Sequence, residues 1–103
     1  MLIFEQISSL EECLNSFRGD DLSIALVPTM GGLHDGHLKL IDKAKDCSDL
    51  VVVSVFVNPT QFAENEDFEA YPKTLSEDRK LLEAAKVEVM FAPSDNEIYP
   101  DGS

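Results

Sequence analysis

The stretch that most constrains the fold is Leu26–His37, in which an apolar run is followed by glycines and then by two histidines. The run Ile24–Val27 predicts a buried β-strand, and Leu40, Ile41 and Ala44 share one face of a predicted helix after it. A strand, a glycine-containing turn and a helix N-terminus form the phosphate-binding geometry of open α/β sheets. Glycines let the backbone approach an anion, and the first turn of a helix offers unpaired N–H groups. The stretch therefore predicts an α/β fold with an anion site where this strand ends.

The rest of the chain continues the alternation of strands and helices. Strands are expected over residues 2–4, 24–27, 50–57 and 87–92, and helices over residues 8–18, 37–47 and 74–85. Capping boxes at Ser8–Glu12 and at Thr74 predict where two of the helices begin. The run Leu50–Val57 lacks polar alternation, which is typical of a parallel strand covered on both faces. In 103 residues this order predicts a parallel sheet in one domain or less.

The charge of the chain excludes two classes of partner. With 20 acidic and 8 basic residues the formal net charge is −12. Nucleic acid is not expected as a partner, because phosphate backbones are held by an excess of Lys and Arg. An anionic membrane surface is not expected as a partner for the same reason. We find no apolar run of membrane-spanning length and no signal-peptide pattern, and Cys13 and Cys47 are expected to be reduced and packed. A cytoplasmic protein is therefore expected.

Polar side chains follow two of the predicted strands at the point where each strand ends. His34 and His37 follow the first of these strands, and Asn58 and Gln61 follow the strand at residues 50–57. Because parallel strands end at the same edge of a sheet, all four side chains are expected to lie close together there. Asp78 is predicted on the inward side of the third helix, in its first turn, which is an unusual place for an acid.

Two motifs carry a resemblance to a known family. The segment Pro28–His37, PTMGGLHDGH, resembles the nucleotide-binding signature of pantothenate synthetase (pantoate–β-alanine ligase), and Phe56–Phe62, FVNPTQF, resembles that family's second motif. Segments Asn65–Phe68, Tyr71–Thr74 and Phe91–Ser94 continue in the family's order and spacing. His-x-Gly-His alone marks the wider superfamily of nucleotidylyl transferases and class I aminoacyl-tRNA synthetases. The two motifs together are highly specific, and the resemblance covers essentially the whole chain.

The resemblance implies a two-step ligation. Pantoate and ATP give pantoyl adenylate and pyrophosphate, and β-alanine then displaces AMP to give pantothenate. It implies a Rossmann-like three-layer αβα sandwich with a parallel sheet, of which residues 1–103 are the N-terminal part. A later phosphate-binding lysine and the C-terminal lid domain have no counterpart here, so the chain is expected to be a fragment, and turnover by this piece alone is left open. The resemblance further implies Mg²⁺, with no ligands expected in this chain, and a homodimer.

The resemblance also implies which residues act. His34 and His37 are expected to be catalytic, donating to oxygens that gain negative charge when pantoate attacks the α-phosphorus, and His37 is also expected to carry a proton to the leaving group. Gln61 is expected to grip a hydroxyl and a carboxylate of pantoate. ATP is expected to contact Met30, Gly31, Gly32, Leu33, His34, Asp35, Gly36 and His37. Pantoate or β-alanine is expected to contact Pro28, Thr29, Met30, Asn58, Gln61, Tyr71 and Asp78.

Several assignments have structural alternatives. His37 could be a core histidine on the apolar stripe of its helix, and with His34 it could bind zinc, although no third His or Cys lies at a usual ligand spacing. Gln61 could cap a turn. A purely structural role is also open for Thr29, Met30, Tyr71 and Asp78. The functional alternatives are a nucleotidylyl transferase for another small substrate and a non-catalytic nucleotide-binding or dimerisation module.

Overall fold

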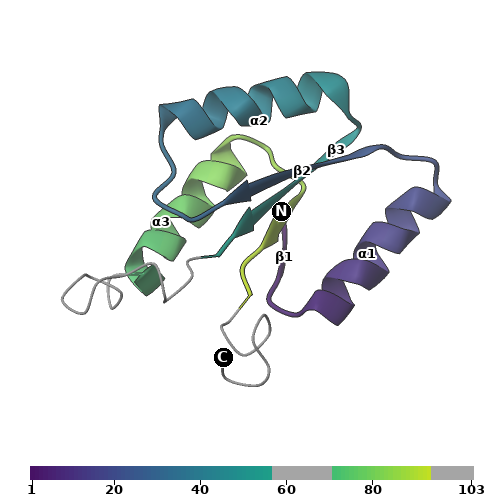
Figure 1. The fold of residues 1–103 in the computed structure, drawn as a ribbon, viewed down its shortest axis with the longest axis horizontal. Helices are drawn as coiled ribbons and strands as arrows, with labels where there is room; N and C mark the ends of the chain where they lie inside the picture. The colour runs from purple at the N-terminus through teal and green to yellow at the C-terminus, as the bar shows by residue number, and fades with distance from the viewer. Residues whose placement is uncertain (57–70, 94–103) are drawn as a thin grey trace.

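A parallel β-sheet organises the chain (Figure 1). The computed structural model describes residues 1–56 and 71–93, with only the backbone for residues 71–74. The elements in chain order are β1 (Leu2–Phe4), α1 (Ile7–Gly19), β2 (Ile24–Thr29), α2 (Asp35–Cys47), β3 (Leu50–Val55), α3 (Tyr71–Ala84) and β4 (Val89–Phe91). The strands lie in the order β1-β4-β3-β2, and every pairing between them is parallel. The predicted α/β class with a parallel sheet is confirmed.

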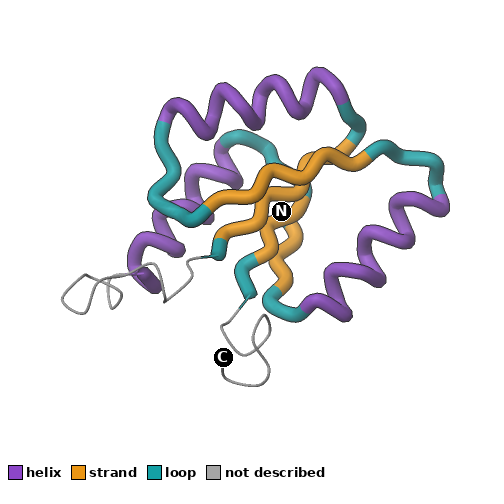
Figure 2. Tube along the Cα trace, viewed as in Figure 1, coloured by secondary structure: helices purple, strands orange, loops and turns teal. Residues whose placement is uncertain are grey.

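Helices cover both faces of this sheet. Figure 2 shows the strands between α1 on one side and α2 with α3 on the other. Val53 and Val55 of β3 pack in one core cluster with Ile41 of α2 and Leu82 of α3. Val52 points to the opposite face, because side chains alternate along a strand, and it is also fully buried. Burial on both faces explains the unbroken apolar run of β3 and gives the predicted three-layer αβα arrangement.

The first and third helices begin earlier than predicted. α1 begins at Ile7 after Gln6, which makes no side-chain capping bond, so the capping box predicted at Ser8–Glu12 was wrong. α3 begins at Tyr71 rather than near Thr74. The spacing of a capping box also occurs inside a helix, where residues three apart share a face, so the pattern alone does not fix the first residue.

The buried face of α2 differs from the prediction at one residue. Leu38 and Ala44 pack with Ile41 against the core, whereas Leu40 is 52% exposed. Successive helical residues are rotated by about 100°, so Leu40 points away from the direction of its neighbour Ile41. The prediction that Leu40 lies on the inward stripe was therefore wrong.

The two cysteines are free, but only one of them is partly packed. Cys13 is half-buried in α1, and this burial raises the pKa of its thiol. Cys47 is exposed at the end of α2. The prediction that both cysteines are packed was wrong for Cys47, because its position after Ile41 places it off the buried face of the helix.

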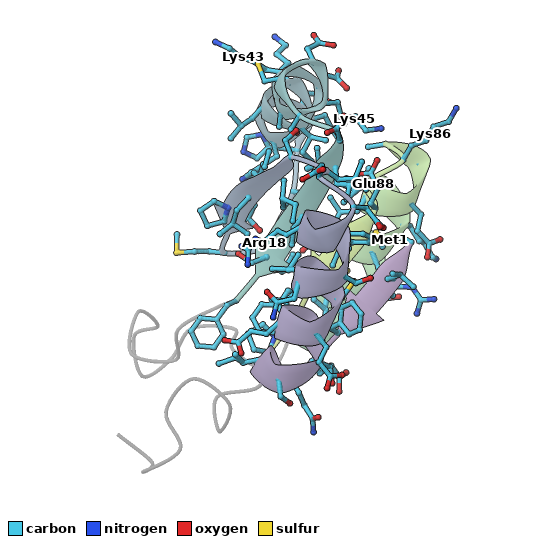
Figure 3. The ribbon with its side chains drawn as sticks, turned by 90° about the vertical axis from the view of Figure 1, so that its right-hand side faces the viewer. Met1, Arg18, Lys43, Lys45, Lys86 and Glu88 are labelled. Atoms are coloured by element: carbon cyan, nitrogen blue, oxygen red, sulfur yellow. The ribbon has the colours of Figure 1, made fainter. Side chains whose placement is uncertain are left out.

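Polar contacts join several elements at the end of the sheet where β3 starts. A carboxylate oxygen of Glu88 accepts a hydrogen bond from the N–H of Val51 at 2.8 Å, and Nζ of Lys45 donates to the carbonyl of Ala85 at 2.6 Å. Figure 3 shows Glu88 on the side of the molecule that also carries Met1, and both residues line the same pocket. These contacts tie α2, β3 and the turn before β4 together.

Glu88→Ala is expected to lower the free energy of unfolding by about 1–3 kcal/mol, because the N–H of the fully buried Val51 would lose its acceptor. Glu83→Ala is the matched control, since Glu83 makes only an exposed 3.2 Å ion pair with Arg79, worth roughly 0.5 kcal/mol. Urea unfolding followed by circular dichroism measures both. Equal losses would show that the bond to Val51 contributes no more than a surface pair.

Candidate functional site

The candidate site forms where β2 ends and α2 begins. At the last residue of β2, Oγ1 of Thr29 donates to the carbonyl of Ser54 at 2.9 Å, and the Thr29 carbonyl accepts from the N–H of Phe56 at 3.1 Å. Figure 1 shows the loop after β2 and the end of β3 at the same end of the sheet. The prediction that these two strands end at one edge is confirmed as far as Phe56. Asn58 and Gln61 lie outside the described residues.

The turn after β2 is built on two glycines. Gly31 and Gly32 have φ angles of 87° and 64°, a region that favours glycine because it has no Cβ. The N–H of Gly31 lies 3.4 Å from Oγ1 of Thr29. Leu33 then places its side chain in the core, where it is 8% exposed. The turn is thus attached to the strand at one end and to the core at the other.

A buried carboxylate of α3 also holds this turn. Asp78 is 2% exposed, and its Oδ2 and Oδ1 accept from the N–H groups of Gly32 at 3.0 Å and Leu33 at 2.9 Å. Its predicted inward orientation is confirmed. The prediction that it lies in the first turn was wrong, because α3 already begins at Tyr71. In the sequence, the only signal for these hydrogen bonds is an acid on an apolar helix face, and it does not identify their partners.

The two histidines form a capping box at the start of α2. Nδ1 of His34 accepts from the N–H of Gly36 at 3.1 Å, and Nδ1 of His37 accepts from the N–H of His34 at 3.2 Å. The ring centroids are 4.3 Å apart with the planes at 61°. A nitrogen that accepts carries no hydrogen, so each neutral ring has its hydrogen on Nε2. Two imidazole rings with Nε2–H donors therefore lie beside each other at a helix N-terminus, where the macrodipole favours an anion.

His37 does not match the core-histidine alternative. It is half-buried and takes part in the cap of α2. Its Nδ1 is used by a backbone N–H, so the side chain has a defined position without contributing to the apolar core.

Gly36 makes room for the ring of His34. A Cβ on Gly36 would lie 3.0 Å from Cε1 and 3.3 Å from Nδ1 of that ring. Both distances are shorter than the roughly 3.5–4.0 Å at which non-bonded carbon atoms attract each other. A side chain larger than glycine at position 36 would therefore crowd the ring of His34, which would have to shift by a few tenths of an ångström.

Several backbone donors of this region already have acceptors. The N–H groups of Gly32 and Leu33 donate to Asp78, and that of Gly36 donates to His34. Backbone contacts from the turn to a nucleotide stay a prediction. The capping box uses the Nδ1 atoms of His34 and His37, so their Nε2–H groups stay available as donors to an anion.

The remaining predicted residues surround the turn to different extents. Met30 is 61% exposed beside the glycines, Pro28 is exposed on β2, and Asp35 is the exposed first residue of α2. The backbone of Tyr71 begins α3, but its side chain lies outside the described part. The contacts predicted for these residues stay predictions.

The described segments contain no group of three or more His, Cys, Asp or Glu side chains that could hold a metal ion. The zinc alternative for the two histidines therefore has no further ligands there, and the Mg²⁺ implied by the family resemblance has no ligand cluster in these segments either. None of the described helices combines the length and the apolar character that crossing a membrane would require.

Comparisons with known proteins show which family this chain resembles in sequence and backbone. A family model for pantoate-beta-alanine ligase matches residues 2–102. One similar structure is the crystal structure of pantoate-beta-alanine ligase from Francisella tularensis, complexed with beta-gamma ATP and beta-alanine. It is 46% identical in sequence with a TM-score of 0.85, and the match covers 99% of this chain and 39% of the Francisella tularensis chain. Two structures of the enzyme from Thermus thermophilus are 42% and 40% identical with TM-scores of 0.77 and 0.73, covering 99% of this chain and 35% of theirs.

The chain thus spans well under half the length of these structures. Its parallel sheet is part of the Rossmann-like nucleotidylyl transferase fold that they share. Because the family model matches nearly every residue and the solved relatives are this similar in sequence and backbone, the chain belongs to the pantoate-beta-alanine ligase family.

Proposed function

We propose that this chain is the nucleotide-binding part of an enzyme that uses ATP to join pantoate and β-alanine through a pantoyl-adenylate intermediate. The observation that carries the proposal is the capping box of His34 and His37, which directs both Nδ1 atoms to the backbone and keeps both Nε2–H groups as donors. The relative from Francisella tularensis, complexed with beta-gamma ATP and beta-alanine, supports the same choice of substrates.

The first proposed step activates the carboxylate of pantoate. A carboxylate oxygen forms a bond to the α-phosphorus of ATP, and the bond from this phosphorus to the bridging oxygen breaks, which releases pyrophosphate. Negative charge grows on the phosphoryl and bridging oxygens, and donors fixed in place stabilise it more than they stabilise the bound substrate. We assign this role to His34 and His37, with His37 also giving a proton to the leaving group. Removing one such donor typically costs about 10²–10³ in rate.

In the second proposed step the amine of β-alanine attacks the acyl carbon. The new amide bond forms, the amine loses a proton, and the bond to the phosphate oxygen breaks, which releases AMP. This step needs little beyond holding the amine and the adenylate together in the right orientation, because an acyl adenylate already has a good leaving group.

Substrate contacts are proposed for the residues around the turn. For ATP we assign the segment Met30–His37, whose exposed members flank the histidines. For pantoate or β-alanine we assign Asn58 and Gln61, which follow β3 in sequence, together with residues at the end of β2 and on α3. The residues assigned to pantoate or β-alanine are Pro28, Thr29, Met30, Asn58, Gln61 and Tyr71. Asp78 does not belong to this set, because it is 2% exposed and both of its carboxylate oxygens accept hydrogen bonds from the turn.

Three further features are proposed from the family resemblance. Mg²⁺ would neutralise part of the triphosphate charge beside a chain of net charge −12, but no reaction step is assigned to it. A homodimer is the second of these features. A cytoplasmic location is the third.

The test is isotope exchange between labelled pyrophosphate and ATP, measured with the full-length gene product. Exchange that requires pantoate is the expected result. Exchange that requires a different acid would contradict the ligase and favour another nucleotidylyl transferase. ATP binding without exchange would favour the non-catalytic module, an alternative kept because the chain spans only 39% of the first relative.

A further inference from the structure

We propose that Asp78 is a positioning residue, whose carboxylate occupies the anion-binding concavity of the glycine turn and thereby sets the position of the two histidines. The expected effect on activity rests on the proposed function. The hydrogen bonds between Asp78 and the turn do not depend on it. Asp78 then acts through the turn, and not by the direct contact with pantoate that the family resemblance implies.

The concavity is formed by consecutive backbone N–H groups. Gly31 and Gly32 both have positive φ, and the N–H groups of Gly32 and Leu33 point to the two oxygens of one carboxylate at 3.0 and 2.9 Å. Successive N–H groups in such a turn form a typical site for an anion. Here a side chain of the same chain is the anion. The oxygens of Asp78 have these partners although the residue is 2% exposed, so its charge is compensated where water has little access.

The position of the histidines depends on this turn. Leu33, whose N–H is bonded to Asp78, directly precedes His34, the residue that caps α2. On its other side the turn is joined to β2 through Thr29. Asp78 belongs to α3, 46 residues along the chain from Gly32, so its bonds fix the turn relative to a third element. Without the carboxylate, the glycines would be free to take other conformations. The start of α2 would then no longer be held in one position relative to α3.

The geometry can be tested without a substitution. In the wild-type chain, NMR scalar couplings across the hydrogen bonds are expected between the amide nitrogens of Gly32 and Leu33 and the carboxyl carbon of Asp78. Their absence, in spectra where couplings across the β2–β3 pairing are observed, would overturn the proposal, even if no variant at this position folds.

The direct variant is Asp78→Asn, which keeps the shape but has one acceptor where the turn presents two donors. Hydrogen exchange at Gly32 and Leu33 is expected to become about tenfold faster or more, because one buried N–H loses a charged acceptor. Exchange at Val53, in the centre of β3, reports whether the fold as a whole has loosened. Glu77→Gln, the same chemical change at the exposed neighbour on α3, is the matched control and is expected to leave all three amides unchanged.

Activity in the full-length gene product then separates positioning from stability. In Asp78→Asn, the pantoate-dependent exchange rate per folded enzyme is expected to fall about tenfold or more, with the KM for ATP changing less, because misplaced donors act on the transition state. In a His34→Asn background the same substitution is expected to cost less, since one of the two imidazoles that it misplaces is already absent.

The outcomes distinguish this inference from the proposed function. If the wild-type enzyme shows no pantoate-dependent exchange, the proposed function fails, and the couplings and amide exchange alone decide the role of Asp78. If the wild type is active but Asp78→Asn matches Glu77→Gln, or costs the same factor with and without His34, the positioning role is overturned.

Discussion

Replacing the histidines by residues that keep the helix cap is expected to abolish most activity while leaving stability almost unchanged. In His34→Asn the new side chain is among the best N-caps, and in His37→Gln the carboxamide oxygen can accept from the N–H of residue 34 as in an ordinary capping box. Each variant loses one Nε2–H donor, so the rate of adenylate formation is expected to fall about 10²–10³-fold. The free energy of unfolding is expected to change by less than about 0.5 kcal/mol, since the capping bond is replaced.

The measurements are pyrophosphate exchange in the full-length gene product and urea unfolding of the same preparations. His37→Ala is the companion variant, because it removes both the donor and the cap and is expected to add a stability loss of about 1 kcal/mol. Asp42→Asn, an exposed change on the same helix, is the control and should alter neither quantity. If His37→Gln retained the wild-type exchange rate, the imidazole would be no more than a cap, and the catalytic assignment would fail.

Gly36→Ala is expected to reduce activity without weakening the fold. The new Cβ would stand 3.0 Å from Cε1 of His34, and the exposed ring is the part that can move away. Alanine favours a helix over glycine by up to about 1 kcal/mol. The lost capping bond costs about as much, so the free energy of unfolding is expected to stay roughly equal. The displaced ring would lose its bond to the backbone, and a shift of this kind is expected to lower the exchange rate about 10–100-fold.

The control for this variant is Gly19→Ala at the end of α1, where a Cβ would meet no atom within 4 Å. It should leave activity unchanged. Combining Gly36→Ala with His34→Asn provides the second check, because the penalty should disappear once the ring is gone. A penalty that persists there would place the effect of Gly36 in the backbone rather than in the ring of His34.

The sequence was sufficient for the class of fold and for most of the elements. Apolar runs separated by helical patterns predicted the strands. The unbroken apolar run of β3 predicted burial on both faces, which the structure confirms at Val52 and Val53. Helix starts were less predictable, because a capping-box spacing recurs inside helices. The strand order β1-β4-β3-β2 could not be read either, since it depends on contacts between segments far apart in sequence.

The candidate site shows the same division. That His34 and His37 stand at a helix start after a glycine turn follows from local order alone, because neighbouring residues in a strand–turn–helix segment have few ways to be placed. Which atoms of these residues are free to bind an anion does not follow from local order. The N–H groups of Gly32 and Leu33 are taken by Asp78, which is 46 and 45 residues away along the chain.

For this protein the amino-acid order by itself determined the α/β alternation, the motif segments and the position of the two imidazoles, since short-range sterics and apolar periodicity act within a few residues. The tertiary structure alone decided which acceptor holds the turn: it is one buried carboxylate, 46 and 45 residues along the chain from Gly32 and Leu33. The physical reason is that buried N–H groups must find acceptors, and the acceptor nearest in space is set by how the helices pack on the sheet.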